Sequence, residues 1–178
     1  MKTSLLVLCA VYNRLMGIAA VYDTPAPRST QIVRLLDGSP VVGSEHLLPG
    51  GKRVSEFLGI PYAEAPTGSR RFGPPVEKSK WIQVFNATKL PNSCPQAIDT
   101  YFGSSFRGSE MWNANTQLSE DCLYVNIWAP QSRDRAPLPV MVWIYGGGFS
   151  SGTSTLPLYD GKTLASEENV IVVSFNYR

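Results

Sequence analysis

VMVWIYGGGF, residues 140–149, is an apolar run that ends in three consecutive glycines. The run is typical of a buried strand with both faces covered by other parts of the fold. Glycines directly after such a strand bring backbone N–H groups close to a ligand, because no Cβ stands in the way. These groups suit the stabilisation of a negative charge that develops on a reacting oxygen. The alternative interpretation is a plain glycine-rich turn between two strands.

Composition indicates a globular protein. The chain has 178 residues, of which 43% are hydrophobic and 17% are charged. A net charge of +2 is too small to indicate binding to nucleic acid or to an anionic membrane surface. Fifteen glycines and fourteen prolines predict many turns and long ordered loops.

Hydrophobic patterning predicts short strands on either side of a loop-rich middle. The middle, residues 62–119, is too long for a structureless loop in a compact domain, so we expect it to be ordered and functional. One short helix is expected, with Asp160 as its N-cap. The expected elements are a strand–turn–strand unit at 32–42, strands at 53–58 (ended by Gly59 and Pro61), 123–128, 140–145 and 170–175, and the helix at 162–168.

The first 20 residues predict a secretory signal peptide. They carry Lys2, an apolar core at residues 5–11 and small residues around Ala19. A disordered leader is the alternative. The sequon that begins at Asn86 is a candidate glycosylation site of a secreted protein.

Three cysteines occur, and one of them, Cys9, lies inside the predicted signal peptide. Its removal leaves Cys94 and Cys122, an even pair that can close one loop in an oxidising compartment. Two buried free thiols remain the alternative at this point.

Several long motifs, in this order, resemble the type B carboxylesterase family and, within it, the cholinesterases. The motifs are FLGIPYA at 57–63, RF at 71–72, SEDCLYVN at 119–126 and VWIYGGGF at 142–149. The segment GSEMWN at 108–113 is most similar to the acetylcholinesterases.

This resemblance implies an α/β fold, namely the N-terminal part of an α/β-hydrolase, in which antiparallel strands lead into the central sheet. We expect the fold to be incomplete. Residues 21–178 would then form a truncated N-terminal portion of the catalytic domain, because the apolar strand at 170–175 is followed by only three residues.

The resemblance also assigns roles to single residues. Gly147 and Gly148 correspond to glycines whose N–H groups form part of the oxyanion hole. Trp112 corresponds to the tryptophan that faces the quaternary ammonium group of choline, and Tyr159 to a tyrosine packed behind it. Asp99 corresponds to an acidic residue that attracts cations at the mouth of the active-site gorge.

Two further family features concern the loop that carries Trp112. The resemblance pairs Cys94 with Cys122 in the first disulfide of the family, and Arg71 with Glu120 in an ion pair at the base of the loop. Ala97 and Ser150 depart from the family, because acetylcholinesterases usually have tyrosines there. Weaker stacking of peripheral ligands is expected as a result.

The catalytic triad is missing from these motifs. Residues 148–152 match the pattern G-x-S-x-G, but they lack a following helix, and the only histidine, His46, lies upstream. We therefore reject Ser150 as the nucleophile.

The expected function is that of a secreted serine esterase that hydrolyses choline esters such as acetylcholine, without metal or cofactor. This chain would supply the oxyanion donors and the choline-binding ring, but no nucleophile, acid or histidine. Oligomerisation or membrane attachment would depend on segments nearer the C-terminus of the full protein. A general carboxylesterase and a non-catalytic adhesion protein similar to the neuroligins are the alternatives, and Trp112 argues against the former.

Overall fold

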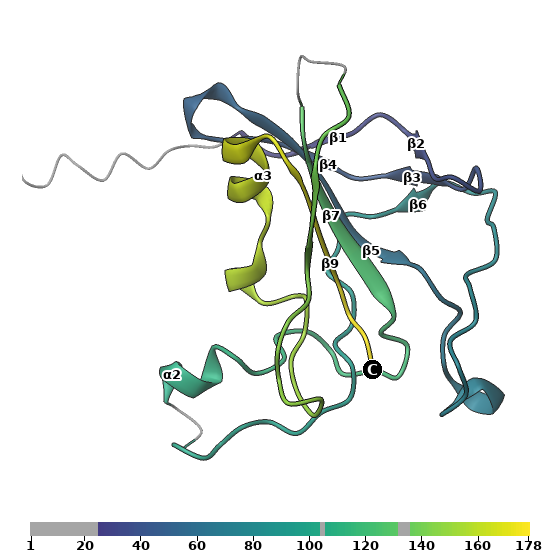
Figure 1. Cartoon of the computed structure of the whole chain (residues 1–178), viewed down its shortest axis with the longest axis vertical. Coiled ribbons are helices and arrows are strands. Elements are labelled where there is room, and N and C mark those ends of the chain that lie inside the picture. Colours follow the sequence, from purple (N-terminus) through teal and green to yellow (C-terminus); the bar gives the residue numbers. More distant parts are fainter. Residues whose placement is uncertain (1–24, 104–105, 132–135) are drawn as a thin grey trace, which may run out of the picture.

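The computed structural model describes residues 25–103, 106–131 and 136–178, so the predicted signal peptide at 1–20 lies outside the described residues. A mixed six-stranded sheet forms its centre (Figure 1). Neighbouring strands are antiparallel except for the last pair, β8 and β9, which is parallel. In spatial order the strands are β1 (Arg28–Ser29), β4 (Ser44–Leu47), β5 (Arg53–Pro61), β7 (Tyr124–Pro130), β9 (Ile171–Phe175) and β8 (Val140–Trp143).

A second, three-stranded sheet consists of β2 (Val33–Arg34), β3 (Pro40–Val42) and β6 (Phe85–Asn86). β2 and β3 pair antiparallel, which confirms the predicted strand–turn–strand unit. The carboxylate of Asp37 accepts hydrogen bonds from the amide and hydroxyl of Ser39. These bonds lower the pKa of Asp37 and hold the turn.

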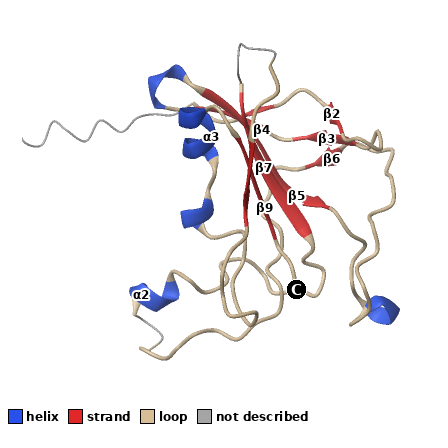
Figure 2. Ribbon diagram, in the orientation of Figure 1, coloured by secondary structure: helices blue, strands red, loops and turns tan. Residues whose placement is uncertain are grey.

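Helices are few and short (Figure 2). α3 (Lys162–Glu168) has the predicted bounds, and it ends at Asn169, which adopts a left-handed conformation with φ 52°. The N-cap position is occupied by Gly161, one residue later than predicted, although the carboxylate of Asp160 still accepts a hydrogen bond from the Lys162 amide. The other helical segments are α2 (Arg107–Glu110) and the 3₁₀ turns η1 (Pro49–Gly51), η2 (Gly68–Arg70) and η3 (Pro157–Tyr159). Among the described residues, no helix is long and apolar enough to cross a membrane.

The main sheet is covered on both faces at its centre. α3 packs on one face, and the three-stranded sheet lies on the other (Figure 1). Alternating side chains of β5 divide between these layers, since Phe57 points to the small sheet and Leu58 to the helix. The buried members of the helix-side core are Val54, Leu58, Trp128, Ala165, Val170 and Val172, and those of the opposite core are Val41, Phe57, Ile60 and Ala87.

β5 continues through Gly59, where the sequence predicted its end. The register between β5 and β7 shifts between Phe57 and Ile60, which marks a bulge. Gly59 has φ +68°, and a Cβ there would lie 2.9 Å from the carbonyl oxygen of Lys89. Glycine therefore permits the bulge, and the amide of Gly59 donates to Asn126 Oδ1 at 3.0 Å.

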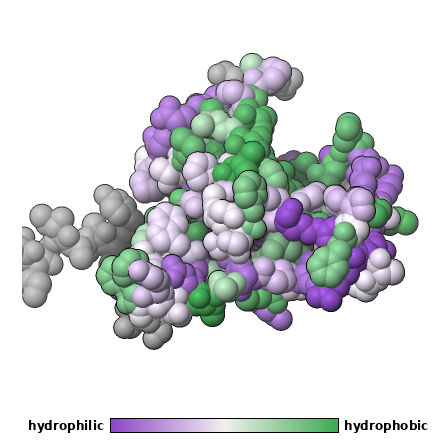
Figure 3. Space-filling model, turned by 60° about the horizontal axis from the view of Figure 1, so that its bottom comes forward, coloured by the Kyte–Doolittle hydropathy of each residue, from purple (hydrophilic) through white to green (hydrophobic). Residues whose placement is uncertain are grey.

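β8 is not buried on both faces, so that prediction was wrong for the described residues. Val140, Met141, Val142 and Trp143 are 47–57% exposed. The reason is position: β8 is the edge strand, and α3 and the small sheet cover only the strands further in. Figure 3 shows apolar and polar side chains side by side on one face of the molecule.

One buried carboxylate joins α3 to the sheet. Glu56 accepts a hydrogen bond from the Trp128 indole at 2.8 Å and from the Lys162 ammonium at 2.7 Å, and it contacts His46 Nε2 at 2.9 Å. Burial disfavours the charged form of Lys162, but its bonds to Asp160 and Glu56 outweigh this and raise its pKa. Lys162 therefore stays charged at neutral pH, and its bond to Glu56 holds the first turn of α3 to the sheet.

Candidate functional site

The glycine triplet forms a tight loop after β8. The carbonyl oxygen of Gly147 accepts the amides of Ser150 and Ser151, each at 3.1 Å. Gly147 has φ +156°, and a Cβ on it would lie 1.8 Å from the carbonyl oxygen of Ser151, so no other residue fits this loop. Within the described part of the chain, the N–H groups of Gly147 and Gly148 donate no hydrogen bond, and both residues are exposed. They are available to an anionic oxygen.

A buried polar segment follows the loop. Thr153, Ser154 and Thr155 are at most 2% exposed. The amide of Ser154 donates to Asn176 Oδ1 at 2.8 Å, and its hydroxyl accepts a bond from Asn126 Nδ2 at 3.2 Å. Because Asn126 lies in β7 and Asn176 directly follows β9, the exit of the loop is held against the main sheet.

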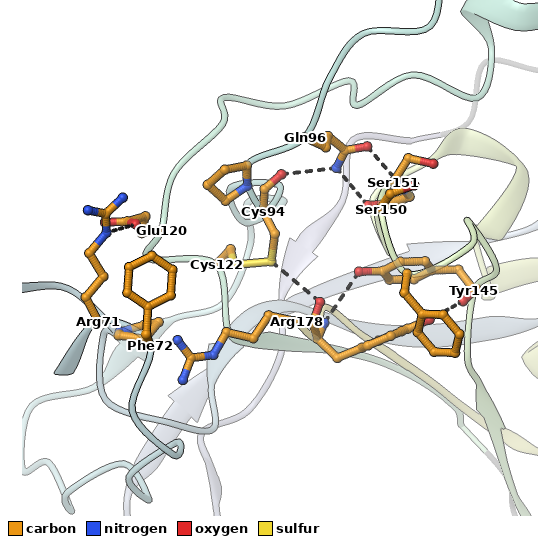
Figure 4. Close-up of a pocket in the computed structure, with 15 residues that line it drawn as sticks. Arg71, Phe72, Cys94, Gln96, Glu120, Cys122, Tyr145, Ser150, Ser151 and Arg178 are labelled. Carbon is orange, nitrogen blue, oxygen red and sulfur yellow. Dashed lines mark hydrogen bonds and ion pairs between the residues drawn. A yellow bond between two sulfur atoms is a disulfide. The ribbon is translucent and has the colours of Figure 1, made fainter.

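Residues 94–122, which the Cys94–Cys122 disulfide closes into one loop, are called the cystine loop. Gln96 connects the glycine loop to this cystine loop (Figure 4). Its side-chain amide exchanges two bonds with the backbone of Gly152, at 2.8 and 2.9 Å, and donates to the carbonyl of Cys94 at 3.1 Å. Cys94 and Cys122 form a disulfide with an S–S distance of 2.06 Å, which confirms the predicted pairing. One side-chain amide thus positions two segments that are 56 residues apart.

A cavity of about 730 Å³ opens between these two segments (Figure 4). Its walls include the disulfide, Phe149 and the stacked rings of Tyr145 and Tyr177, whose centroids are 4.8 Å apart. Burial raises the pKa of the Tyr145 hydroxyl. The predicted disulfide and ion-pair residues line this cavity, but neither Trp112 nor Gly147 and Gly148, the predicted oxyanion donors, do so.

Three aromatic rings gather instead around Tyr159, and one of them belongs to Trp143, the last residue of the strand β8 that leads into the glycine loop. The ring centroids of Trp112 and Tyr159 are 6.5 Å apart, and those of Trp143 and Tyr159 are 5.2 Å apart. The predicted pair Trp112 and Tyr159 is therefore in contact distance, and Trp112 keeps half of its surface exposed. Sequence reasoning missed Trp143, because it was read as part of a buried strand.

Asp99 is fixed near Trp112 through its backbone. The amide of Asp99 donates to Asn113 Oδ1 at 2.8 Å, and Asn113 Nδ2 donates to the Asp99 carbonyl at 3.1 Å. Its carboxylate accepts the amide of Tyr101 at 2.9 Å and stays exposed. Asn113, the neighbour of Trp112 in the sequence, thus positions Asp99 at the surface.

Arg71 and Glu120 form an ion pair at the cavity edge, with Arg71 also 4.9 Å from the ring centroid of Phe72. Both partners are more than one third exposed, so the pair contributes on the order of 1 kcal/mol or less to stability.

The residues of the G-x-S-x-G pattern do not form a catalytic dyad. Ser150 and Ser151 both donate their hydroxyl groups to the carbonyl of Gly147. The chain has a single histidine, His46, and its Nε2 atom lies within hydrogen-bond distance of the Glu56 carboxylate in the main sheet. Among the described residues, no group of three histidine, cysteine or acidic side chains could hold a metal ion.

Residues 29–178 match the sequence profile of the Carboxylesterase family. The chain belongs to the carboxylesterase family. It is similar to acetylcholinesterase 1 of Caenorhabditis briggsae (56% identical over 151 residues, 84% of this chain and 24% of that protein). It is also similar to acetylcholinesterase 1 of Caenorhabditis elegans (55% identical over 151 residues, 84% of this chain and 24% of that protein). The cholinesterase of Mus musculus is 59% identical over 128 residues, 72% of this chain and 21% of that protein.

The chain therefore spans about a quarter of the length of the curated relatives it matches. Membership of the carboxylesterase family implies the α/β-hydrolase fold, and the mixed sheet with α3 on one face is consistent with it.

We predict that Gly147→Ala disrupts the loop while Gly148→Ala does not. A Cβ at Gly147 collides with the Ser151 backbone, whereas at Gly148 no atom lies within 4 Å, and only the left-handed φ of +58° adds a penalty of about 1–2 kcal/mol. Amide hydrogen exchange of Ser150 and Ser151 measures the difference. Exchange should accelerate in the first variant only, and equal protection in both variants would contradict the loop geometry.

Proposed function

We propose that this chain is the N-terminal portion of a cholinesterase-like serine esterase that hydrolyses choline esters such as acetylcholine through an acyl-serine intermediate. The observation that carries the proposal is that two uncommitted backbone donors, at Gly147 and Gly148, follow β8, whose last residue, Trp143, belongs through Tyr159 to an aromatic group that contains Trp112. The similarity to two acetylcholinesterases and a cholinesterase supports this choice of substrate class.

The two halves of the proposed site serve different parts of the substrate. Donors at the glycine loop would stabilise the oxyanion of the tetrahedral intermediate, where the loss of one donor typically costs ~10²–10³ in rate. A trimethylammonium group cannot donate hydrogen bonds, but an indole face attracts it by about 0.5–2 kcal/mol. Trp112 would provide this face, and Tyr159 packs behind it at 6.5 Å.

Asp99 would act earlier, during association. Its carboxylate is exposed, so salt screens its attraction for a cation, and it affects the rate of encounter more than the final affinity. The proposed reaction requires no metal or cofactor.

We further propose that residues 21–178 are part of a larger carboxylesterase domain. The nucleophile, the acid and the catalytic histidine would come from other segments of the full protein. The exposed apolar side chains of β8 support this, because an edge strand of such composition is usually covered or paired. Oligomerisation or membrane attachment would also depend on other segments.

Secretion is proposed from three features that agree. Residues 1–20 have the pattern of a signal peptide, the cystine Cys94–Cys122 suits an oxidising compartment, and Asn86 is exposed on β6. Asn86 would carry an N-linked glycan.

Expression of the chain in a secretory system should therefore give a product whose mass falls on treatment with an N-glycosidase. Thr88→Ala removes the sequon but keeps Asn86, and the mass shift should disappear. A shift that persists in Thr88→Ala would exclude glycosylation at Asn86.

The 178-residue chain alone should hydrolyse no choline ester above background. Ser150 and Ser151 donate their protons to a backbone carbonyl, and no histidine is placed to accept one. An acetylthiocholine assay of the purified chain measures this. Turnover that is abolished by Ser150→Ala would show that the loop holds a nucleophile after all.

In a full-length protein that contains this segment, Trp112→Ala should lower kcat/KM for acetylcholine about 10-fold more than for 3,3-dimethylbutyl acetate, a neutral ester of the same shape. The charged substrate loses the ring attraction of up to about 2 kcal/mol, while the neutral one loses only packing. Equal losses for the two esters would favour a general carboxylesterase, with Trp112 as a structural residue.

A further inference from the structure

A second, smaller cavity of about 250 Å³ lies on the side of β5 and β7 that faces the three-stranded sheet. None of its lining residues belongs to the candidate site described above. Aromatic rings and short apolar side chains make up most of its wall, and two charged side chains border it, Asp121 and Lys78.

The aromatic wall is held rigidly. The indole N–H of Trp81 donates to the carbonyl of Pro40 at 3.0 Å, and its backbone amide donates to the hydroxyl of Ser39 at 3.1 Å. The ring of Phe85, in β6, packs against that of Trp81 with centroids 5.9 Å apart. Both rings are partly buried, so they keep an accessible surface without being free to move. A ligand would meet a preorganised wall.

The charges around the cavity sum to one negative charge. Lys78 is neutralised by Glu64, whose Oε2 accepts its ammonium at 2.9 Å. Hydrogen bonds from Lys78 and from Ser79 lower the pKa of Glu64 to about 2, so this partner stays ionised at neutral pH. Asp121 has no cationic partner among the described residues.

The carboxylate of Asp121 is oriented by a neutral donor. Tyr124 donates its hydroxyl to Asp121 Oδ1 at 2.9 Å. Burial, together with this bond and the adjacent negative charge, raises the pKa of Tyr124 to about 12. The Tyr124 hydroxyl therefore keeps its proton at neutral pH and acts as the donor to Asp121. The other carboxylate oxygen, Oδ2, makes no hydrogen bond within the described part of the chain.

We propose that this cavity binds a small organic ammonium ion, with its alkyl groups against Trp81 and Phe85 and its charge toward Asp121. An ion of this class matches the aromatic rings and the free carboxylate of the wall: aromatic faces attract a cation electrostatically, and Asp121 provides the counter-charge, while Glu64 neutralises Lys78. A cavity of about 250 Å³ has room for a tetramethylammonium ion.

The test titrates the ¹⁵N-labelled 178-residue chain with tetramethylammonium and, separately, with tert-butanol as a neutral molecule of similar shape. The indole ¹⁵N–¹H resonance of Trp81 reports on the cavity, and that of Trp112 reports on the proposed choline site. Tetramethylammonium should shift the Trp81 resonance in a saturable manner, and tert-butanol should shift it only weakly.

Three variants assign the effect. Asp121→Asn keeps the acceptor for Tyr124 and removes the charge, so the affinity at Trp81 should fall about tenfold. Phe85→Leu keeps an apolar wall without a π-face and should weaken binding about fivefold. Glu168→Gln removes an equal charge from the exposed end of α3 and should change nothing at Trp81.

The response of Trp112 should survive Asp121→Asn, which separates this proposal from that of the choline site. Equal shifts of Trp81 by the cation and the alcohol, or equal effects of Asp121→Asn and Glu168→Gln, would overturn the proposal. So would saturable binding of acetate at Trp81, which would assign the cavity to anions held by Lys78.

Discussion

The structure depends on a buried network of hydroxyl and amide side chains between the main sheet, the glycine loop and the cystine loop. All of its members are buried, and each has a hydrogen-bond partner within the network or the adjacent backbone. They are Ser93, Asn126, Thr153, Ser154, Thr155, Ser174 and Asn176. A buried polar group without a partner costs about 1–3 kcal/mol, so a network of this kind allows one arrangement of the chain and penalises the others.

The consequence is that the glycine loop can be ordered although it is held mainly at its exit. The loop itself makes few contacts, and Gly147 adopts a conformation that only glycine tolerates. Its exit is anchored by Asn126 and Asn176, and Gln96 holds Gly152 to the cystine loop. In this way the N–H groups proposed as oxyanion donors stay unpaired without the loop collapsing onto them.

Capping and turn residues in the sequence predicted the elements that depend mainly on neighbouring residues. The helix at 162–168 and the hairpin around Asp37 have strong capping and turn signals, and both are present. Burial of β8 was predicted wrongly, because it depends on which elements lie beside a strand and not on the strand's own composition. Gly59 was read as a strand end because the bonding partner that permits its bulge, Asn126, lies 67 residues away. The contact between Trp112 and Tyr159 was expected only through family resemblance, while Trp143 completed the group unexpectedly.

The most direct test of this account is amide hydrogen exchange in the variant Asn176→Ala. The substitution removes the acceptor of the Ser154 amide, which lies outside the glycine loop. If the network holds the loop in place, exchange should accelerate about tenfold or more at Ser154 and also at Ser150 and Ser151, whose amides bond to Gly147. Acceleration at Ser154 alone, with unchanged protection of Ser150 and Ser151, would show that the loop is ordered independently and would contradict the account.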